Sequence, residues 1–199
     1  MGNVVLALSG GFDSLAVLED LNSQGIVPFV WHWNNPNEPD SKELLKTLEV
    51  EGKIILTENS FMGSAVCASE VINDEVRVYL PYRRAYIVLM THMFARTVPN
   101  VTDIYYGFRN DMPQVEQERL ENLRHILFTF GKNKQKPYYI MHMPLADKEI
   151  VDVTKGKKSK LKQYIQLANK ECEWHGTNYK EGCFKCRDIQ LWLNKVGIK

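Results

Sequence analysis

The sequence has few cysteines, no long hydrophobic run and no excess of charge of one sign. Only four of its 199 residues are cysteine, and three lie together near the C-terminus, where clustering indicates a metal site more than disulfide bonds. The apolar run at residues 4–8 is too short for a signal peptide or a membrane span. The 25 basic residues nearly balance the 24 acidic ones, so the net charge of +1 gives no strong attraction to nucleic acid or membranes. We therefore expect a cytoplasmic protein with no membrane association, and direct nucleic-acid binding is not favoured.

Segments of strand and helix character alternate along the first part of the chain. Residues 4–8 predict a strand buried on both faces of a sheet, and residues 14–21 carry apolar side chains at helical spacing. Residues 26–33 and 53–56 predict two more strands, with a helix capped by Ser41 between them. This alternation predicts a parallel sheet with right-handed crossovers.

The rest of the chain continues the pattern after one irregular stretch, residues 57–80. Beyond it we expect an apolar helix, a strand, a charged amphipathic helix and a last strand, over residues 83–96, 103–106, 113–130 and 138–141. The composition shifts after Asp147, where a basic hinge follows. The expected fold class is therefore α/β. A doubly wound parallel sheet covers residues 1–154, and a small C-terminal helical and zinc-binding module covers residues 155–199.

A glycine-rich loop, Ser9-Gly10-Gly11-Phe12-Asp13-Ser14, joins the first predicted strand to the first helix. In an open α/β sheet, ligands bind at the carboxyl ends of the strands, where this loop lies. Small residues let backbone N–H groups converge on an anion, and the helix adds its positive end. The Ser9 and Ser14 hydroxyls could donate to phosphate oxygens. The loop lacks the Gly-Lys-Ser/Thr ending of a Walker A motif and the third glycine of a dinucleotide fingerprint, so it predicts a phosphate site of another kind.

The string Ser-Gly-Gly-x-Asp-Ser resembles the signature of the PP-loop, or N-type ATP pyrophosphatase, superfamily. Members of that superfamily hold the β,γ-pyrophosphate of ATP in this loop and cleave between the α and β phosphates. The resemblance implies that adenine lies near the end of the second strand, where an exposed aromatic cluster around His32 could stack on the base. The implied ATP-binding residues are Ser9, Gly10, Gly11, Asp13, Ser14 and His32.

The C-terminal cysteines form a metal-ligand pattern with one histidine. Cys172, His175, Cys183 and Cys186 follow the spacing C-x2-H-x7-C-x2-C, which matches tetrahedral structural zinc. A closed set of four ligands leaves no open position for catalysis, so the expected role is structural. Cys67 stands alone among apolar neighbours and is expected to be a small core residue.

A PP-loop followed by a zinc cluster resembles the 7-cyano-7-deazaguanine synthase family of the queuosine pathway. Residues 80–83, 104–107 and 144–151 also resemble stretches of that family. Two departures stand out: Ile189 occupies the place of a fourth cysteine, and residues 108–113 replace the family's Tyr-Pro-Asp-Cys-Arg substrate loop. The chain therefore resembles a divergent, compact member.

The resemblance implies an ATP-dependent ligase that makes a nitrile. The carboxylate of 7-carboxy-7-deazaguanine is adenylated, ammonia displaces AMP to give an amide, and a second adenylation drives loss of the amide oxygen. The implied cofactors are ATP, Mg²⁺ and structural Zn²⁺. Asp13, Arg83 and Lys148 are the expected catalytic residues. Arg109 is expected to hold the carboxylate and Asp111 to read the guanine-like edge.

Two other functions stay open. One is a PP-loop adenylating enzyme that acts on a tRNA base or a related deazaguanine. The near-neutral charge and the isolated Cys67 argue against direct tRNA chemistry, which needs a basic face and, for sulfur transfer, a reactive cysteine. The other is a catalytically silent nucleotide-binding module, favoured by the altered substrate loop and opposed by the intact Ser-Gly-Gly-x-Asp-Ser string. Apolar surface on the helix at residues 83–96 would allow a homodimer, by analogy with the family.

Overall fold

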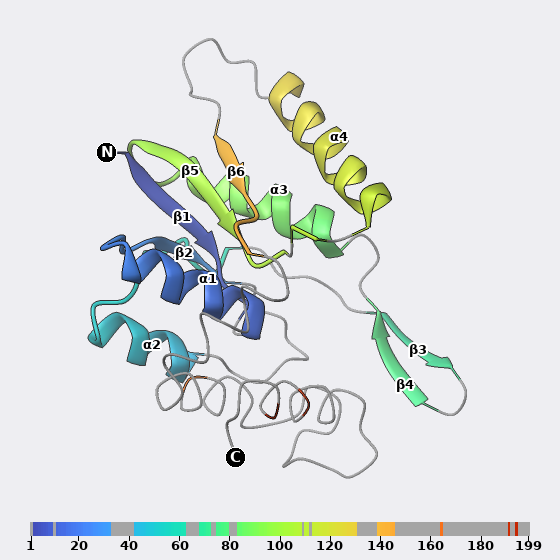
Figure 1. Cartoon of the computed structure of the whole chain (residues 1–199), viewed down its shortest axis with the longest axis horizontal. Helices are drawn as coiled ribbons and strands as arrows, with labels where there is room; N and C mark the ends of the chain where they lie inside the picture. Colours follow the sequence, from blue (N-terminus) through green and yellow to red (C-terminus); the bar gives the residue numbers. More distant parts are fainter. Residues whose placement is uncertain are drawn as a thin grey trace.

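A computed structural model of the chain shows an α/β protein (Figure 1). The structure describes residues 2–9, 11–32, 42–62, 68–72, 75–79, 83–108, 110–111, 113–130 and 139–145, and the single positions 164, 191 and 194. None of the helices in these stretches is long and apolar enough to cross a membrane. The elements, in chain order, are β1 (Asn3–Ala7), α1 (Phe12–Ser23), β2 (Phe29–Trp31), α2 (Lys42–Val50), β3 (Ala68–Ile72), β4 (Glu75–Tyr79), α3 (Arg83–Ala95), β5 (Val101–Tyr106), α4 (Gln114–Phe130) and β6 (Ile140–His142).

Four parallel strands form the central sheet in the order β2-β1-β5-β6, which confirms the expected parallel arrangement. The strand expected at residues 53–56 is reduced to a single parallel bridge between Ile55 and Phe29. Two hydrogen bonds hold it: the Val30 N–H donates to the Ile55 carbonyl at 3.1 Å, and the Ile55 N–H donates to the Pro28 carbonyl at 2.9 Å. This segment therefore lies beside β2 at the edge of the sheet and pairs with it at one residue only.

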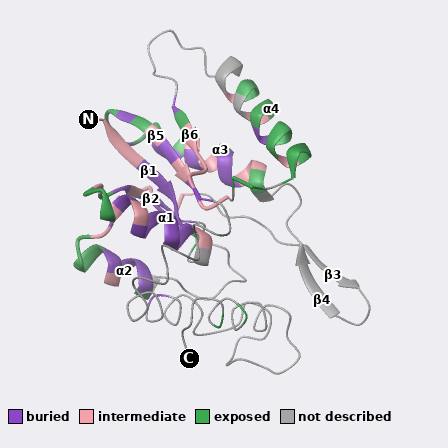
Figure 2. Cartoon of the chain, viewed as in Figure 1, coloured by how far each residue is buried: buried purple, intermediate pink, exposed green. Residues whose placement is uncertain are grey.

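Helices cover both faces of this sheet, as a doubly wound fold requires (Figure 2). Successive strand residues point to opposite faces, so Leu6 of β1 and Leu8 just after it pack with α1 and α2, whereas Val5 and Ala7 pack with α3 and α4. Both sets are buried, which explains why β1 reads as a continuous apolar run. Tyr164, within the predicted C-terminal module, is also buried in the first cluster, and its hydroxyl donates a hydrogen bond to a carboxylate oxygen of Glu51.

Glycines end α1 and α2 in the same way. Gly25 and Gly52 have φ angles of 75° and 68°, the left-handed region that side chains with a Cβ disfavour. At the end of α1 the Gly25 N–H donates to the Asn22 carbonyl, and the Ile26 N–H donates to the Leu21 carbonyl, which is a Schellman motif. The motif satisfies helix carbonyls that would otherwise lack partners and turns the chain back toward the next strand.

Residues 57–80 contain structure that the sequence analysis did not predict. β3 and β4 form an antiparallel hairpin, with Val71 opposite Val76, that stands apart from the main sheet (Figure 1). β4 alternates polar and apolar residues as a strand does, a signal that the sequence prediction did not use, whereas β3 does not alternate. By contrast, the long helices expected around residues 83–96 and 113–130, and the strands expected around 103–106 and 138–141, are confirmed within a few residues of their bounds.

Candidate functional site

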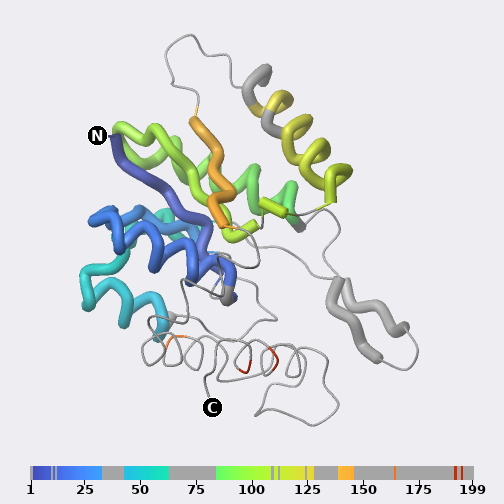
Figure 3. Tube along the Cα trace, in the orientation of Figure 1, coloured from blue at the N-terminus to red at the C-terminus, as the bar shows by residue number. Residues whose placement is uncertain are grey.

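The order of the strands reverses at β1, which has β2 on one side and β5 on the other. Chain connections leave β1 and β5 in opposite directions at such a point, and the crevice between their carboxyl ends is where open α/β sheets bind ligands. The glycine-rich loop follows β1 there, and Gly107 follows β5. The first turns of α1, α3 and α4 also lie at this end of the sheet (Figure 3). We refer to this end as the carboxyl edge.

Hydrogen bonds between its own residues shape the loop. The Ser9 N–H donates to the Ser14 Oγ at 3.3 Å, and the Ser14 hydroxyl donates to the Gly11 carbonyl at 3.0 Å. The two Oγ atoms are 3.1 Å apart, and the Gly11 N–H donates to the Ser9 Oγ at 3.4 Å. Ser14 is buried and Ser9 is exposed. Ser14 therefore holds the loop together, and the Ser9 hydroxyl is the one at the surface.

The N-terminus of α1 has backbone N–H groups without helical acceptors. Its cap, Gly11, is extended, with φ −76° and ψ 164°, and makes no side-chain cap hydrogen bond. The first helical hydrogen bond runs from the Leu15 N–H to the Gly11 carbonyl at 3.1 Å, so the N–H groups before it have no helical acceptor. Together with the helix dipole, these groups favour an oxyanion in front of the loop. Asp13 supplies a carboxylate in the same first turn.

Gly107 is the site residue that the sequence analysis did not single out. A Cβ placed on Gly107 would lie 2.7 Å from the backbone nitrogen of Ser14, 2.8 Å from its Cα and 2.9 Å from its Cβ. The end of β5 thus touches the backbone of the first turn of α1, an approach that only glycine permits. The sequence signal was its place directly after a strand, but nothing in the sequence says what it touches. Gly107 therefore sets how closely the end of β5 approaches the first turn of α1.

The aromatic cluster expected to be exposed at the end of β2 is buried where the structure describes it, so that expectation is wrong for Trp31 and His32. The His32 Nδ1 lies 2.7 Å from the Leu8 carbonyl, and its ring meets Phe61 edge to face at 6.0 Å. Because a carbonyl only accepts, Nδ1 carries the proton. The Trp31 indole N–H donates to the Met62 carbonyl at 3.0 Å. His32 therefore braces the end of β1 just before the loop, and both rings are used for packing.

The segment expected to bind substrate is joined to the segment after β6. The Asn110 N–H donates to the Leu145 carbonyl at 3.1 Å, and its side-chain amide donates to the Pro144 carbonyl at 3.2 Å. The Gln117 amide of α4 donates to the Asn110 carbonyl at 3.3 Å. Asp111 is exposed beside this junction. The segment in place of the family's substrate loop therefore meets, near the carboxyl edge, a stretch far away in sequence that resembles the family.

Several predicted site residues lie outside the described residues. Arg83 is the first residue of α3, but its side chain is not described. Within the described part of the chain, no group of three histidine, cysteine or acidic residues could hold a metal ion. The predicted residues outside it are Gly10, Arg109, Lys148, Cys172, His175, Cys183 and Cys186, together with Cys67.

No protein-family model matches the chain. No curated protein sequence matches it at a significant level. Its function therefore has to be inferred from the residues of the site themselves.

Proposed function

We propose that this protein is an ATP-dependent adenylating enzyme of the PP-loop type, which transfers AMP to an oxygen of its substrate and releases pyrophosphate. The observation that carries the proposal is the loop between β1 and α1, which lies where the strand order reverses. Gly107 packs against this loop so closely that a Cβ added to it would lie 2.7 Å from the Ser14 backbone nitrogen. An uncapped helix start, a tight loop of small residues and an exposed Ser9 hydroxyl suit a pyrophosphate group.

Mg²⁺ fits the charges of this site. Asp13 places a negative charge in the turn that would face the phosphates, so a bare pyrophosphate would be repelled by it. A hard cation that binds carboxylate and phosphate oxygens removes that repulsion. In the proposed site, Ser9, Gly10, Gly11 and the first-turn N–H groups bind the pyrophosphate. Ser14 holds the loop in shape, and the Asp13 carboxylate faces the Mg²⁺ and the phosphates that it binds.

For the substrate we propose 7-carboxy-7-deazaguanine, with ammonia as the nitrogen donor and a nitrile as the product. The basis is the resemblance of the sequence to the 7-cyano-7-deazaguanine synthase family. The junction of Asn110 with Pro144 and Leu145 supports it, because it joins the place of the family's substrate loop to one of the stretches that resemble the family. Arg83 and Lys148 would neutralise developing negative charge, Arg109 would hold the carboxylate and Asp111 would read the base edge. Cys172, His175, Cys183 and Cys186 would bind structural Zn²⁺.

The test follows phosphorus products and substrate mass together. The protein is incubated with ATP, Mg²⁺, ammonium and 7-carboxy-7-deazaguanine. AMP and pyrophosphate with a mass change from carboxylate to nitrile support the full proposal. AMP and pyrophosphate without the nitrile keep the adenylating reaction and move the substrate to a tRNA base or a related deazaguanine. Binding of ATP with no AMP formed overturns the enzyme in favour of a nucleotide-binding module.

Two acidic residues of α1 provide a matched pair of variants. Asp13→Asn removes a carboxylate from the first turn, and Asp20→Asn removes one from a later turn, where Asp20 accepts from the Gln24 amide at 3.0 Å. Both change the net charge equally. We expect AMP formation to be lost in Asp13→Asn and kept in Asp20→Asn. Equal loss in both variants would contradict the role of Asp13.

A further inference from the structure

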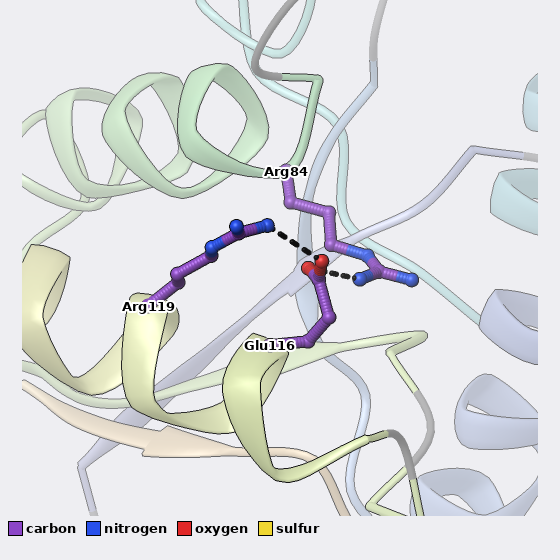
Figure 4. A network of polar contacts seen from close by, with 3 residues as sticks. All are labelled: Arg84, Glu116 and Arg119. Carbon is purple, nitrogen blue, oxygen red and sulfur yellow. Dashed lines mark hydrogen bonds and ion pairs between the residues drawn. The ribbon is translucent and has the colours of Figure 1, made fainter.

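Two arginines from different helices share one carboxylate near the carboxyl edge (Figure 4). An Arg84 guanidinium nitrogen (Nη1) lies 2.6 Å from Oε2 of Glu116, and the corresponding nitrogen of Arg119 lies 3.0 Å from Oε1. Arg84 is in the first turn of α3, and the other two residues are in the first two turns of α4. The side chains of Arg84 and Arg119 remain 46% and 70% exposed, and that of Glu116 is 29% exposed. We call these three residues the arginine pair and its carboxylate.

The position of this group is fixed by the fold. α3 and α4 both begin at the end of the sheet where the loop after β1 lies (Figure 3). One turn of α4 carries Gln117, whose amide holds the Asn110 carbonyl next to the Pro144–Leu145 segment. Glu116 precedes Gln117 directly. The arginine pair is therefore attached, through the first turn of α4, to the segment expected to meet the acceptor substrate.

Stability alone gives little reason to bring two arginines together here. Exposed ion pairs contribute only about 0–1 kcal/mol, and two guanidinium groups repel one another. Glu116 already lies in the first turn of α4, where the helix dipole favours an acidic side chain without any arginine. The three groups together carry a net charge of +1. Each guanidinium has five N–H donors, and the contacts with Glu116 use one nitrogen of each.

We propose that Arg84 and Arg119 are the recognition site for a carboxylate of the acceptor substrate, and that Glu116 holds the two guanidinium groups in place until that carboxylate displaces or joins it. The chemistry of the ligand follows from the group already seated there. Each carboxylate oxygen of Glu116 accepts a charge-assisted hydrogen bond from a different guanidinium, so the pair already binds a carboxylate. Arg109, expected for this role from the sequence, lies outside the described residues. The identity of the acceptor rests on the proposed function.

The direct test is binding of a simple carboxylate to the whole protein, without ATP. Arginine side-chain Nε–H signals of ¹⁵N-labelled protein are followed during titration with sodium benzoate, with sodium chloride titrated in parallel. Arg84 and Arg119 are assigned by Arg84→Lys and Arg119→Lys. We expect both signals to shift with benzoate and to remain in place with chloride. If benzoate shifts neither signal, the proposal is overturned, whether or not inorganic phosphate shifts them.

Three substitutions separate recognition of the carboxylate from a general effect of charge. Arg96, just beyond the other end of α3, is exposed, so Arg84→Gln and Arg96→Gln change the charge equally at opposite ends of one helix. We expect only Arg84→Gln to weaken benzoate binding, by about two- to fivefold, the size of one exposed charge interaction. Glu116→Gln should tighten binding by a similar factor, because it frees both guanidinium groups. Unchanged or weaker binding in Glu116→Gln would show that the pair is only a surface salt bridge.

Failure of this site and failure of the proposed function give different results. If AMP forms but Arg84→Gln leaves the acceptor KM unchanged, the recognition site is wrong and the adenylating function stands. If no AMP forms while benzoate shifts both arginine signals, the carboxylate site stands and the reaction is wrong. Support for both requires a raised acceptor KM in Arg84→Gln with the ATP KM unchanged.

Discussion

Replacing Gly107 with alanine should disturb nucleotide binding far more than it destabilises the fold. The added Cβ would lie 2.7 Å from the Ser14 backbone nitrogen, whereas carbon atoms pack best at about 3.5 Å or more. The first turn of α1 or the end of β5 must therefore move by about 0.8 Å. All the nearest atoms belong to the backbone or Cβ of Ser14, so no side-chain rotation can relieve the contact.

Two magnitudes follow from that shift. Overpacking of this kind costs about 1–3 kcal/mol, and each kcal/mol lowers Tm by about 2–4 °C in a chain of this size. We therefore expect a folded variant with a Tm lower by about 2–12 °C. Because a displacement near 1 Å in a binding site can cost about 100-fold in rate, kcat/KM for ATP should fall by about 10- to 100-fold.

Gly25→Ala is the matched control, since it places the same methyl group at the other end of α1. Gly25 has φ 75° and no atom within 4 Å of a built Cβ, so the variant loses about 1 kcal/mol through backbone conformation alone. Thermal unfolding of both variants measures the loss of stability, and steady-state kinetics measures the loss of kcat/KM for ATP. If Gly107→Ala has the same kcat/KM for ATP as Gly25→Ala at comparable stability, Gly107 does not set the geometry of the site and the reasoning is refuted.

Three further predictions address stability and metal content. Burial lowers the pKa of His92 below its ordinary 6.5, outweighing the hydrogen bond to the Val88 carbonyl. The unfolded chain therefore binds more protons as the pH falls below 6.5, and Tm should decline there in the wild type but less in His92→Gln; parallel Tm profiles for the two proteins would refute this. The Asn22 amide donates to the Ile26 and Lys53 carbonyls at 3.1 Å each, so Asn22→Leu should cost about 2 kcal/mol in denaturant unfolding, and a loss below 0.5 kcal/mol would contradict it. Purified protein should contain one zinc per chain by metal analysis and Cys186→Ser much less; equal zinc in both would remove Cys186 from the ligands.

The local rules of the sequence accounted for most elements of the described fold. β1 is buried on both faces over Val5, Leu6 and Ala7, so this part of the strand is entirely apolar, and α3 and α4 are long enough for their periodicity to be unambiguous. The hairpin of β3 and β4 was missed although β4 alternates polar and apolar residues, because β3 does not alternate and so no partner strand was evident in the sequence. The burial of His32 was missed because whether an aromatic side chain at a strand end faces solvent depends on the neighbours that cover it, here Phe61 and the end of β1.

The sequence by itself determined that a loop of consecutive small residues joins a strand to a helix, and this pattern is what predicts a phosphate site. Tertiary structure alone decided which residues meet the loop. Gly107 reaches Ser14, and Arg84 reaches Glu116 across two helices, at sequence separations of 93 and 32. Such contacts depend on strand order, register and helix packing. These are set by the whole core, so no local pattern records them.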